Sequence, residues 1–132
     1  MKKYNEENHN AQEDFEERLV DAITDGTPDD VREILKEGFE IDLNYLMQLV
    51  MYHCRTVEDV KILKEAGYNF KGDNKAVEEF ATWAALDPKI LQFMLDNGAV
   101  ISWKAIQKCA DRYSIETLRL MINSKKDFFP VD

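Results

Sequence analysis

The sequence predicts an all-α fold, a solenoid of four helix–turn–helix repeats with about eight helices. Three observations predict it: one segment pattern recurs four times, a helix-start residue precedes each copy, and a glycine follows three of them. The copies begin at Val31, Val60, Leu91 and Leu118, at spacings of 29, 31 and 27 residues. Self-similarity at this period is typical of units that stack because none can bury its apolar face alone.

The recurring segments are predicted to be the second helix of each repeat. Residues able to cap a helix N-terminus stand before them, namely Thr27, Thr56, Asp87 and Ser114, and Pro28 and Pro88 occupy the first helical position. Their side-chain oxygens can accept from the unpaired N–H groups of the first turn. Gly38, Gly67 and Gly98 hold one place near the far end, where Lys125 stands in the last copy. Glycine there suits the left-handed residue that ends a helix.

A first helix is expected before each of these, over residues 13–25, 43–54, 75–86 and 102–113. Apolar residues recur at helical spacing in the first of them, at Phe15, Leu19, Ala22 and Ile23. In the fourth, the expected apolar residues are Ile106, Cys109, Ala110 and Tyr113. Residues 1–12 are polar and without period, so we expect a flexible tail there and a single repeat domain over 13–132.

Two of the segments resemble ankyrin repeats. VKILKEAGYNF, from Val60, and LQFMLDNGAVI, from Leu91, are similar to the second helix and following turn of that family. In the first repeat, Leu19, Ala22, Ile23 and Gly26 fall where the family places small apolar residues and glycine. The resemblance covers about residues 15–128. It implies protein–protein recognition through a groove formed by the first helices and the turns.

The repeats are also degenerate and shortened relative to that family. No copy carries the Thr-Pro-Leu-His stretch that opens the family's first helix, and Thr27-Pro28 lies in the other turn. The spacings fall below the family's period of about 33 residues. We therefore expect shortened turns between repeats, which leaves the groove of first helices as the expected binding surface.

Composition and cysteine usage indicate an ordinary cytoplasmic protein. The chain is 45% hydrophobic and 33% charged over 132 residues, which suits one globular domain. Two cysteines make no disulfide framework, so Cys54 and Cys109 are expected to be reduced and partly buried. No apolar run approaches the ~18 residues of a membrane span, so no membrane partner is expected.

No pattern of catalytic or metal-binding residues is found, so we expect neither an enzyme nor a cofactor. His53 and Cys54 are neighbours in a predicted helix, and adjacent helical residues do not face each other. Cys109 lies on a predicted apolar face. The two histidines and two cysteines lack zinc-site spacing, and the chain has no glycine-rich phosphate loop.

The net charge of -9 is concentrated at the start of the chain. Residues 1–42 contain fourteen acidic and five basic residues, whereas acids and bases balance over the remainder. Such an asymmetry favours a partner with a basic surface, for example a nucleic-acid-binding protein, because it steers association. The other interpretation is a solvated face that only keeps the protein in solution.

The candidate binding residues form an acidic and a basic stripe. Asp14, Glu17, Asp21 and Asp25 follow each other at helical spacing on the first predicted helix. They are expected to meet Arg or Lys side chains of a protein partner. In the alternative interpretation, the acids of residues 13–42 together imitate a phosphate backbone. Lys104, Lys108 and Arg112 form the basic stripe on the seventh predicted helix, interpreted as the opposite pole of a bipolar groove or as a solvated face.

Two aromatic residues complete the candidate site. Tyr45 and Trp103 stand near predicted helix starts, where they are interpreted either as interface anchors or as caps on the core. Apart from the basic stripe, the basic residues are dispersed in an acidic chain, so no direct nucleic-acid binding is expected.

Taken together, these features predict a non-enzymatic, monomeric protein-binding module that occludes or scaffolds a partner with a basic surface. The alternative is an acidic nucleic-acid mimic that inhibits a nucleic-acid-processing enzyme, as a host-defence inhibitor or a nuclease immunity protein does.

Overall fold

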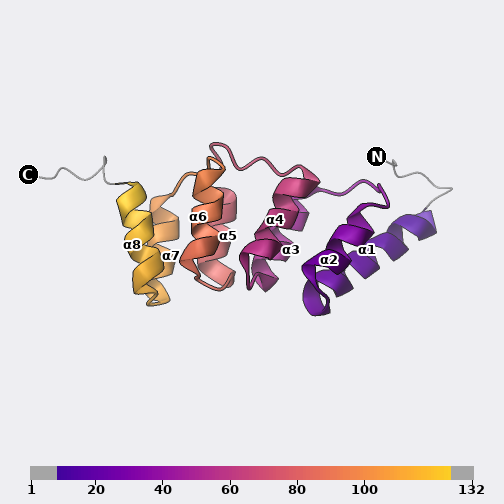
Figure 1. Cartoon of the computed structure of the whole chain (residues 1–132), viewed down its shortest axis with the longest axis horizontal. Coiled ribbons are helices and arrows are strands. Elements are labelled where there is room, and N and C mark those ends of the chain that lie inside the picture. Colours follow the sequence, from indigo (N-terminus) through magenta and orange to yellow (C-terminus); the bar gives the residue numbers. More distant parts are fainter. Residues whose placement is uncertain (1–8, 126–132) are drawn as a thin grey trace, which may run out of the picture.

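The computed structural model describes residues 9–125, and this part of the chain contains eight helices and no strand, as expected for an all-α fold. The helices are α1 (His9–Asp25), α2 (Pro28–Leu35), α3 (Leu43–His53), α4 (Val57–Ala66), α5 (Lys75–Trp83), α6 (Pro88–Asp96), α7 (Trp103–Asp111) and α8 (Ile115–Ser124). They stand in a row of four pairs, with α1 and α2 at one end and α7 and α8 at the other (Figure 1).

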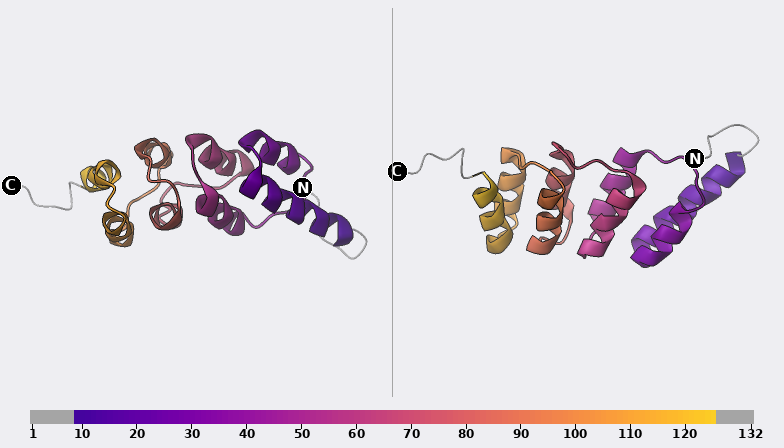
Figure 2. Two further views of the ribbon diagram at one scale, coloured as in Figure 1. Left: turned by 90° about the horizontal axis from the view of Figure 1, so that it is seen from below. Right: turned by 45° about the horizontal axis from the view of Figure 1, so that its top comes forward.

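The eight helices form two layers. Helices α1, α3, α5 and α7 contact one another in sequence, and α2, α4, α6 and α8 do the same. We call these the odd-helix layer and the even-helix layer. Each odd helix also packs on the even helix that follows it, and the view along the helix axes shows the two rows side by side (Figure 2). The exposed side of the odd-helix layer is therefore one continuous surface built from the four first helices.

The core lies between the two layers. It runs from Phe15 and Leu46 through Phe80 and Leu91 to Met121, all of them inaccessible to solvent. The expected apolar face of α1 is confirmed, because Phe15, Leu19 and Ala22 are buried and Ile23 packs against them. Burying these side chains is the main gain that stacking provides, at about 1.5–3 kcal/mol for each large residue.

Two residues expected on the apolar face of the seventh helix are instead exposed. Cys109 is buried and Ile106 half-buried as expected, but Ala110 is exposed and Tyr113 is 87% exposed. The prediction for Tyr113 was wrong because α7 ends at Asp111, before the turn that would have brought Tyr113 back to the core. Ala110 lies within α7 and points about 100° away from its buried neighbour Cys109 around the helix. Tyr113 adopts a left-handed backbone with φ of 58°.

Helix capping largely follows the expectation. The Thr27 hydroxyl accepts from the Asp30 N–H at 3.2 Å, and the Asp30 carboxylate accepts from the Thr27 N–H at 2.9 Å, which forms a capping box. The Asp87 carboxylate accepts from the Lys89 N–H at 2.9 Å. At α4 the bond runs in the reverse direction, from the Thr56 N–H to the Asp59 carboxylate at 3.0 Å.

The fourth expected side-chain cap is absent. The Ser114 hydroxyl makes no cap hydrogen bond to α8 and donates to the Leu86 carbonyl at 3.5 Å instead. At the opposite helix ends, Gly38, Gly67 and Gly98 all have positive φ, as expected for left-handed terminating residues.

Several helix boundaries differ from those expected. Helix α1 begins at His9, so residues 9–12 belong to a helix and not to the tail, and Gln12 is buried with its amide donating to the Glu40 carbonyl at 3.0 Å. Helices α3, α5 and α7 end one to three residues early. The rest of the expected tail, residues 1–8, and the last residues of the fourth pattern, 126–129, lie outside the described residues.

Within residues 9–125, no helix has the length and apolar character needed to cross a membrane.

Candidate partner-binding surface

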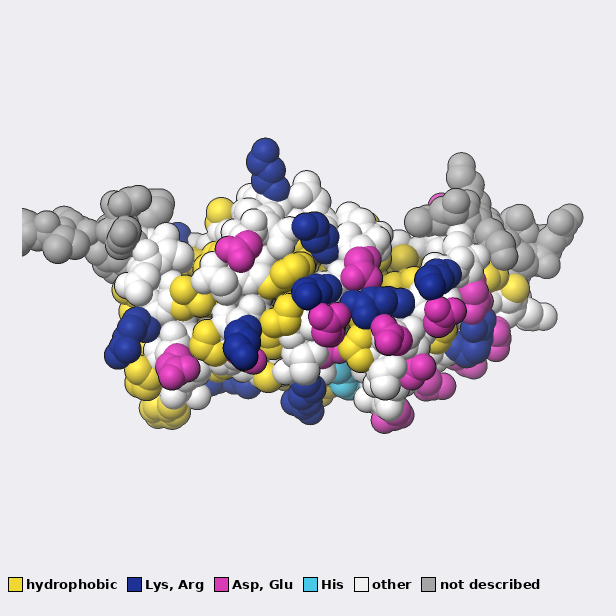
Figure 3. Space-filling view, in the orientation of Figure 1, with side chains coloured by type: hydrophobic (Ala, Val, Ile, Leu, Met, Phe, Trp, Pro, Cys, Tyr) yellow, Lys and Arg dark blue, Asp and Glu magenta, His cyan; other side chains and the backbone are white. Residues whose placement is uncertain are grey.

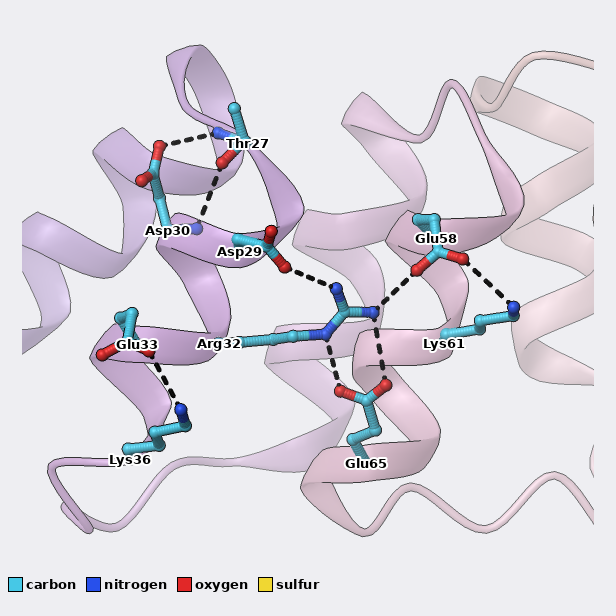
Figure 4. A network of polar contacts seen from close by, with 9 residues as sticks. All are labelled: Thr27, Asp29, Asp30, Arg32, Glu33, Lys36, Glu58, Lys61 and Glu65. Carbon is cyan, nitrogen blue, oxygen red and sulfur yellow. Dashed lines mark hydrogen bonds and ion pairs between the residues drawn. The ribbon is translucent and has the colours of Figure 1, made fainter.

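Four acidic residues of the even-helix layer, Asp29, Glu33, Glu58 and Glu65, form ion pairs within the molecule. The Arg32 guanidinium on α2 contacts Asp29 at 3.0 Å, Glu58 at 3.0 Å and Glu65 at 2.7 Å, and so ties α2 to α4 (Figure 4). Arg32 and Lys61 lower the pKa of Glu58 by hydrogen bonding to its carboxylate. Positive and negative side chains are interspersed over the middle of this face (Figure 3).

One of the four candidate acids on α1 also has an internal cation. Asp14 accepts from Arg18, one turn later, at 2.9 Å. Arg18 in turn makes two bonds to Glu37, at 2.6 and 2.7 Å, which fix the loop after α2 against α1. Asp14 therefore differs from the other three acids, because Arg18 already balances part of its charge.

The other three candidate acids form the unpaired part of the stripe. Glu17, Asp21 and Asp25 are exposed and make no ion pair with any residue in the range 9–125. Their four-residue spacing puts them on one side of α1, each about 6 Å from the next. On α2 and α4, four of the six acids form ion pairs, whereas these three acids of α1 follow one another without one.

Glu17 and Asp21 line an open hollow of about 480 Å³ between α1 and α3, which we call the acidic hollow. Its lining residues are Glu13, Glu16, Glu17, Val20, Asp21 and Tyr45. Asp25 lies beyond it, one turn further along α1. Tyr45 comes from the first turn of α3 and is 51% exposed. The structure therefore brings together two of the candidate acids and one candidate aromatic residue.

Two carboxylates of the acidic hollow, Glu13 and Glu16, are not among the residues predicted from the sequence. Glu13 lies one turn before Glu17 on the same side of α1, so helical spacing alone was sufficient to find it. Glu16 accepts a hydrogen bond from the Gln12 amide at 3.0 Å. It faces the hollow because α3 packs beside α1, a tertiary contact that the spacing within α1 does not reveal.

The second candidate aromatic residue lies at the other end of the row. Trp103 is the first residue of α7 and is 54% exposed. The Lys125 ammonium group stands 6.0 Å from the centre of its ring, a cation–π contact. Trp103 and Tyr45 both lie at the starts of odd helices, but α5 stands between their helices.

The basic stripe contains one residue with a structural role. Lys104 is exposed and Lys108 is half-buried on α7. One guanidinium nitrogen of Arg112 donates to the Ala84 carbonyl at 2.7 Å and to the Ala81 carbonyl at 3.3 Å. Arg112 therefore caps the C-terminal end of α5, where the helix dipole also favours a cation. Sequence spacing did not reveal this role, because the partner residues lie 28 and 31 positions away.

Two aromatic residues that sequence analysis did not single out lie on the same layer. Tyr52 near the end of α3 and Trp83 at the end of α5 are 55% and 49% exposed. Their ring centroids are 5.1 Å apart. Helical spacing places Tyr52 two turns after Tyr45, hence on the same side of α3.

Neither cysteine is prepared for nucleophilic chemistry. Burial raises the pKa of Cys54 to about 12 and also raises the pKa of Cys109, so both remain thiols at neutral pH. Their sulfur atoms face the Thr56 and Ser114 carbonyls. Over residues 9–125, no group of three or more His, Cys, Asp or Glu side chains is placed to hold a metal ion.

No family model matches the chain, and no solved structure matches it. The resemblance to ankyrin repeats consequently depends on the sequence pattern alone.

Proposed function

We propose that the protein is a non-enzymatic, ankyrin-like binding module that occludes or scaffolds a cytoplasmic protein partner with a basic surface. The partner binds to the exposed side of the odd-helix layer, beginning at the acidic hollow. The observation that carries this proposal is the contrast between α1 and the helices α2 and α4. Arg32 and Lys61 compensate acids of the even-helix layer, whereas Glu17, Asp21 and Asp25 have no cation among the described residues.

Physical chemistry favours an interface at such a place. Carboxylates held close together repel one another, and this repulsion is relieved when a partner brings Arg or Lys side chains. The hollow also offers Tyr45 and Val20, which give apolar contact to the stem of a basic side chain. A surface serving only to keep the protein in solution would not require a concave site with an aromatic wall.

The proposal is tested by capture of partners from native extract with tagged protein. The variant carries Glu17→Lys, Asp21→Lys and Asp25→Lys, and circular dichroism establishes that it is folded. We expect wild type to retain a discrete partner with a basic surface and the variant to lose it, because each substitution replaces an attraction by a repulsion.

A charge-matched control separates the acidic stripe from net charge. Glu33→Lys, Asp96→Lys and Glu116→Lys change the charge by the same amount on exposed positions of α2, α6 and α8. This control is expected to retain the partner. Equal capture by wild type and both variants would contradict the proposal and leave the stripe as a solvated face.

The nucleic-acid mimic is the second candidate, and the regular spacing of the unpaired acids favours it. Glu17, Asp21 and Asp25 repeat at about 6 Å along α1, a spacing compatible with a phosphate backbone. If the captured partner is a nucleic-acid-processing enzyme, a mimic must compete with its DNA or RNA and lose affinity steeply as salt rises. A partner that binds this protein and a nucleic acid at the same time would exclude the mimic.

A further inference from the structure

The exposed Tyr52–Trp83 pair lies in the middle of the surface proposed for binding. Each ring is about half exposed although the two are in contact at a centroid distance of 5.1 Å. Neither the Tyr52 hydroxyl nor the Trp83 indole N–H has a hydrogen-bond partner among residues 9–125. Tyrosine and tryptophan are among the residues that contribute most to binding energy at protein interfaces, because each combines a large apolar ring with a polar atom that can form a hydrogen bond.

A cation borders this pair on the side of α7. Arg112 binds the carbonyls of Ala81 and Ala84, the residues that flank Trp83 in the chain. One guanidinium nitrogen makes both bonds, and the remaining donors of Arg112 have no partner in the described part of the chain. The guanidinium is thus held in place beside Trp83 while it can still bind a carboxylate in a defined geometry.

The acidic hollow borders the pair on the side of α1. Tyr45 lines the hollow, and Tyr52 stands on the same side of α3, about 10 Å further along the helix. Across the odd-helix layer the order is therefore acidic at α1, aromatic at α3 and α5, and basic at α7. Adjacent packed helices lie ~8–10 Å apart, so the three parts span about 25–30 Å.

We propose that this layer binds a polarised segment of about eight or nine residues from the partner protein. Its basic side chain enters the acidic hollow, a large apolar side chain covers Tyr52 and Trp83, and an acidic side chain meets Arg112. An extended chain advances ~3.3 Å per residue, so eight or nine residues cover the required length. This inference rests on the proposed function and adds the order of chemical groups along the partner.

The probe is a phage-displayed library of random 12-residue peptides, selected on the whole chain with the substitution Trp103→Phe. In that background Trp83 is the sole tryptophan, since the sequence contains two. We expect selected peptides to share a basic, then apolar, then acidic order in one chain direction. Their binding is measured as a change in Trp83 fluorescence.

Single substitutions test whether the acidic, aromatic and basic parts of the layer each contribute to binding. The selected peptides should bind at least 10-fold more weakly to Tyr52→Ala and to Asp21→Lys. The matched control Gln107→Ala, an exposed position on α7, should leave affinity within 2-fold. Peptides selected on the Arg112→Glu variant should carry a basic residue at the position where the peptides selected on the parent chain carry an acidic one. If that variant does not fold, Arg112→Gln serves instead and should remove the acidic preference.

The outcomes distinguish this inference from the proposed function. Selected peptides that require Asp21 but not Tyr52 or Arg112 would overturn the polarised segment and leave the basic partner intact. Enrichment of no peptide, or of peptides with no shared order of charges, would overturn it as well. If the affinity of the selected peptides is unchanged by Asp21→Lys and by the variant carrying Glu17→Lys, Asp21→Lys and Asp25→Lys, the proposed function itself is contradicted.

Discussion

Arg112 and Tyr113 are neighbours at the end of α7 with different structural roles. Arg112 binds two carbonyls at the end of α5, so a residue expected only on a binding stripe also joins two helix pairs. Tyr113 is 87% exposed and holds a left-handed backbone. A side chain with a Cβ pays about 1–2 kcal/mol in that conformation, which glycine does not.

Replacing Tyr113 by glycine is therefore expected to stabilise the protein. The gain should be about 0.5–1 kcal/mol, because relief of backbone strain exceeds the greater flexibility of glycine in the unfolded chain. Urea denaturation measures it. Ala110→Gly, an exposed position inside α7, is the control and should lose about 0.5–1 kcal/mol. Equal losses from both substitutions would show that the conformation of Tyr113 carries no strain.

At the scale of helices, two of the three hydroxyl residues expected as caps behave differently. Thr27 and Asp30 form a reciprocal capping box at the start of α2. The hydroxyl of Ser114 faces the Leu86 carbonyl at a long 3.5 Å and makes no cap bond to α8. Sequence alone gives both residues the same role.

Thr27→Ala is expected to cost about 1 kcal/mol in the free energy of unfolding, since a satisfied N–H group of α2 loses its partner. Ser114→Ala should cost less than half as much. Urea denaturation of the two variants at one pH gives the comparison. A larger loss from Ser114→Ala would mean that its hydroxyl caps α8 in solution.

The presence of the helices was predictable because the interactions that start, end and bury each helix involve residues close together in the sequence. Caps such as Thr27 and Asp87, terminating glycines such as Gly67, and the apolar spacing of α1 all act within a few residues. Helix ends were less predictable. Gln12 lies in α1 and bonds to Glu40, a residue distant in sequence, and no local pattern reveals that contact.

The candidate site was predictable only in part, for the same reason. Spacing along α1 gave Glu17 and Asp21. It did not show that Asp14 is paired with Arg18, or that Tyr45 of α3 closes a hollow against α1. The pairing of Tyr52 with Trp83 joins residues 31 positions apart, and the repeat length brings them together only once the helices stack.

At the scale of the whole molecule, each helix pair is stabilised by its neighbours. Helix α5 contacts both α3 and α7, whereas α7 has an odd-layer neighbour on one side among the described helices. In such a row stability depends on contacts between adjacent units, so the ends open more readily than the middle. One cysteine lies in each region: Cys54 follows α3, inside the row, and Cys109 lies in α7, in the last helix pair.

Alkylation of the cysteines is expected to show that the α7–α8 end opens more readily than the middle of the row. Both thiols should react slowly in the native protein at pH 8, because both are buried and burial raises their pKa. Cys109 should react before Cys54 as urea increases toward the midpoint. Mass spectrometry of peptides after iodoacetamide pulses measures the two rates. Faster reaction at Cys54 would contradict opening from the α7–α8 end.

The central claim is that the acids of α1 bind a basic partner. Its most direct test is the affinity of the captured partner for wild type, the Glu17→Lys, Asp21→Lys, Asp25→Lys variant and the charge-matched control, each at low and high salt. We expect at least 10-fold weaker binding by the acidic-stripe variant, near wild-type binding by the control, and a loss of wild-type affinity as salt rises. Unchanged affinity of the acidic-stripe variant, or absence of any captured partner, would contradict it.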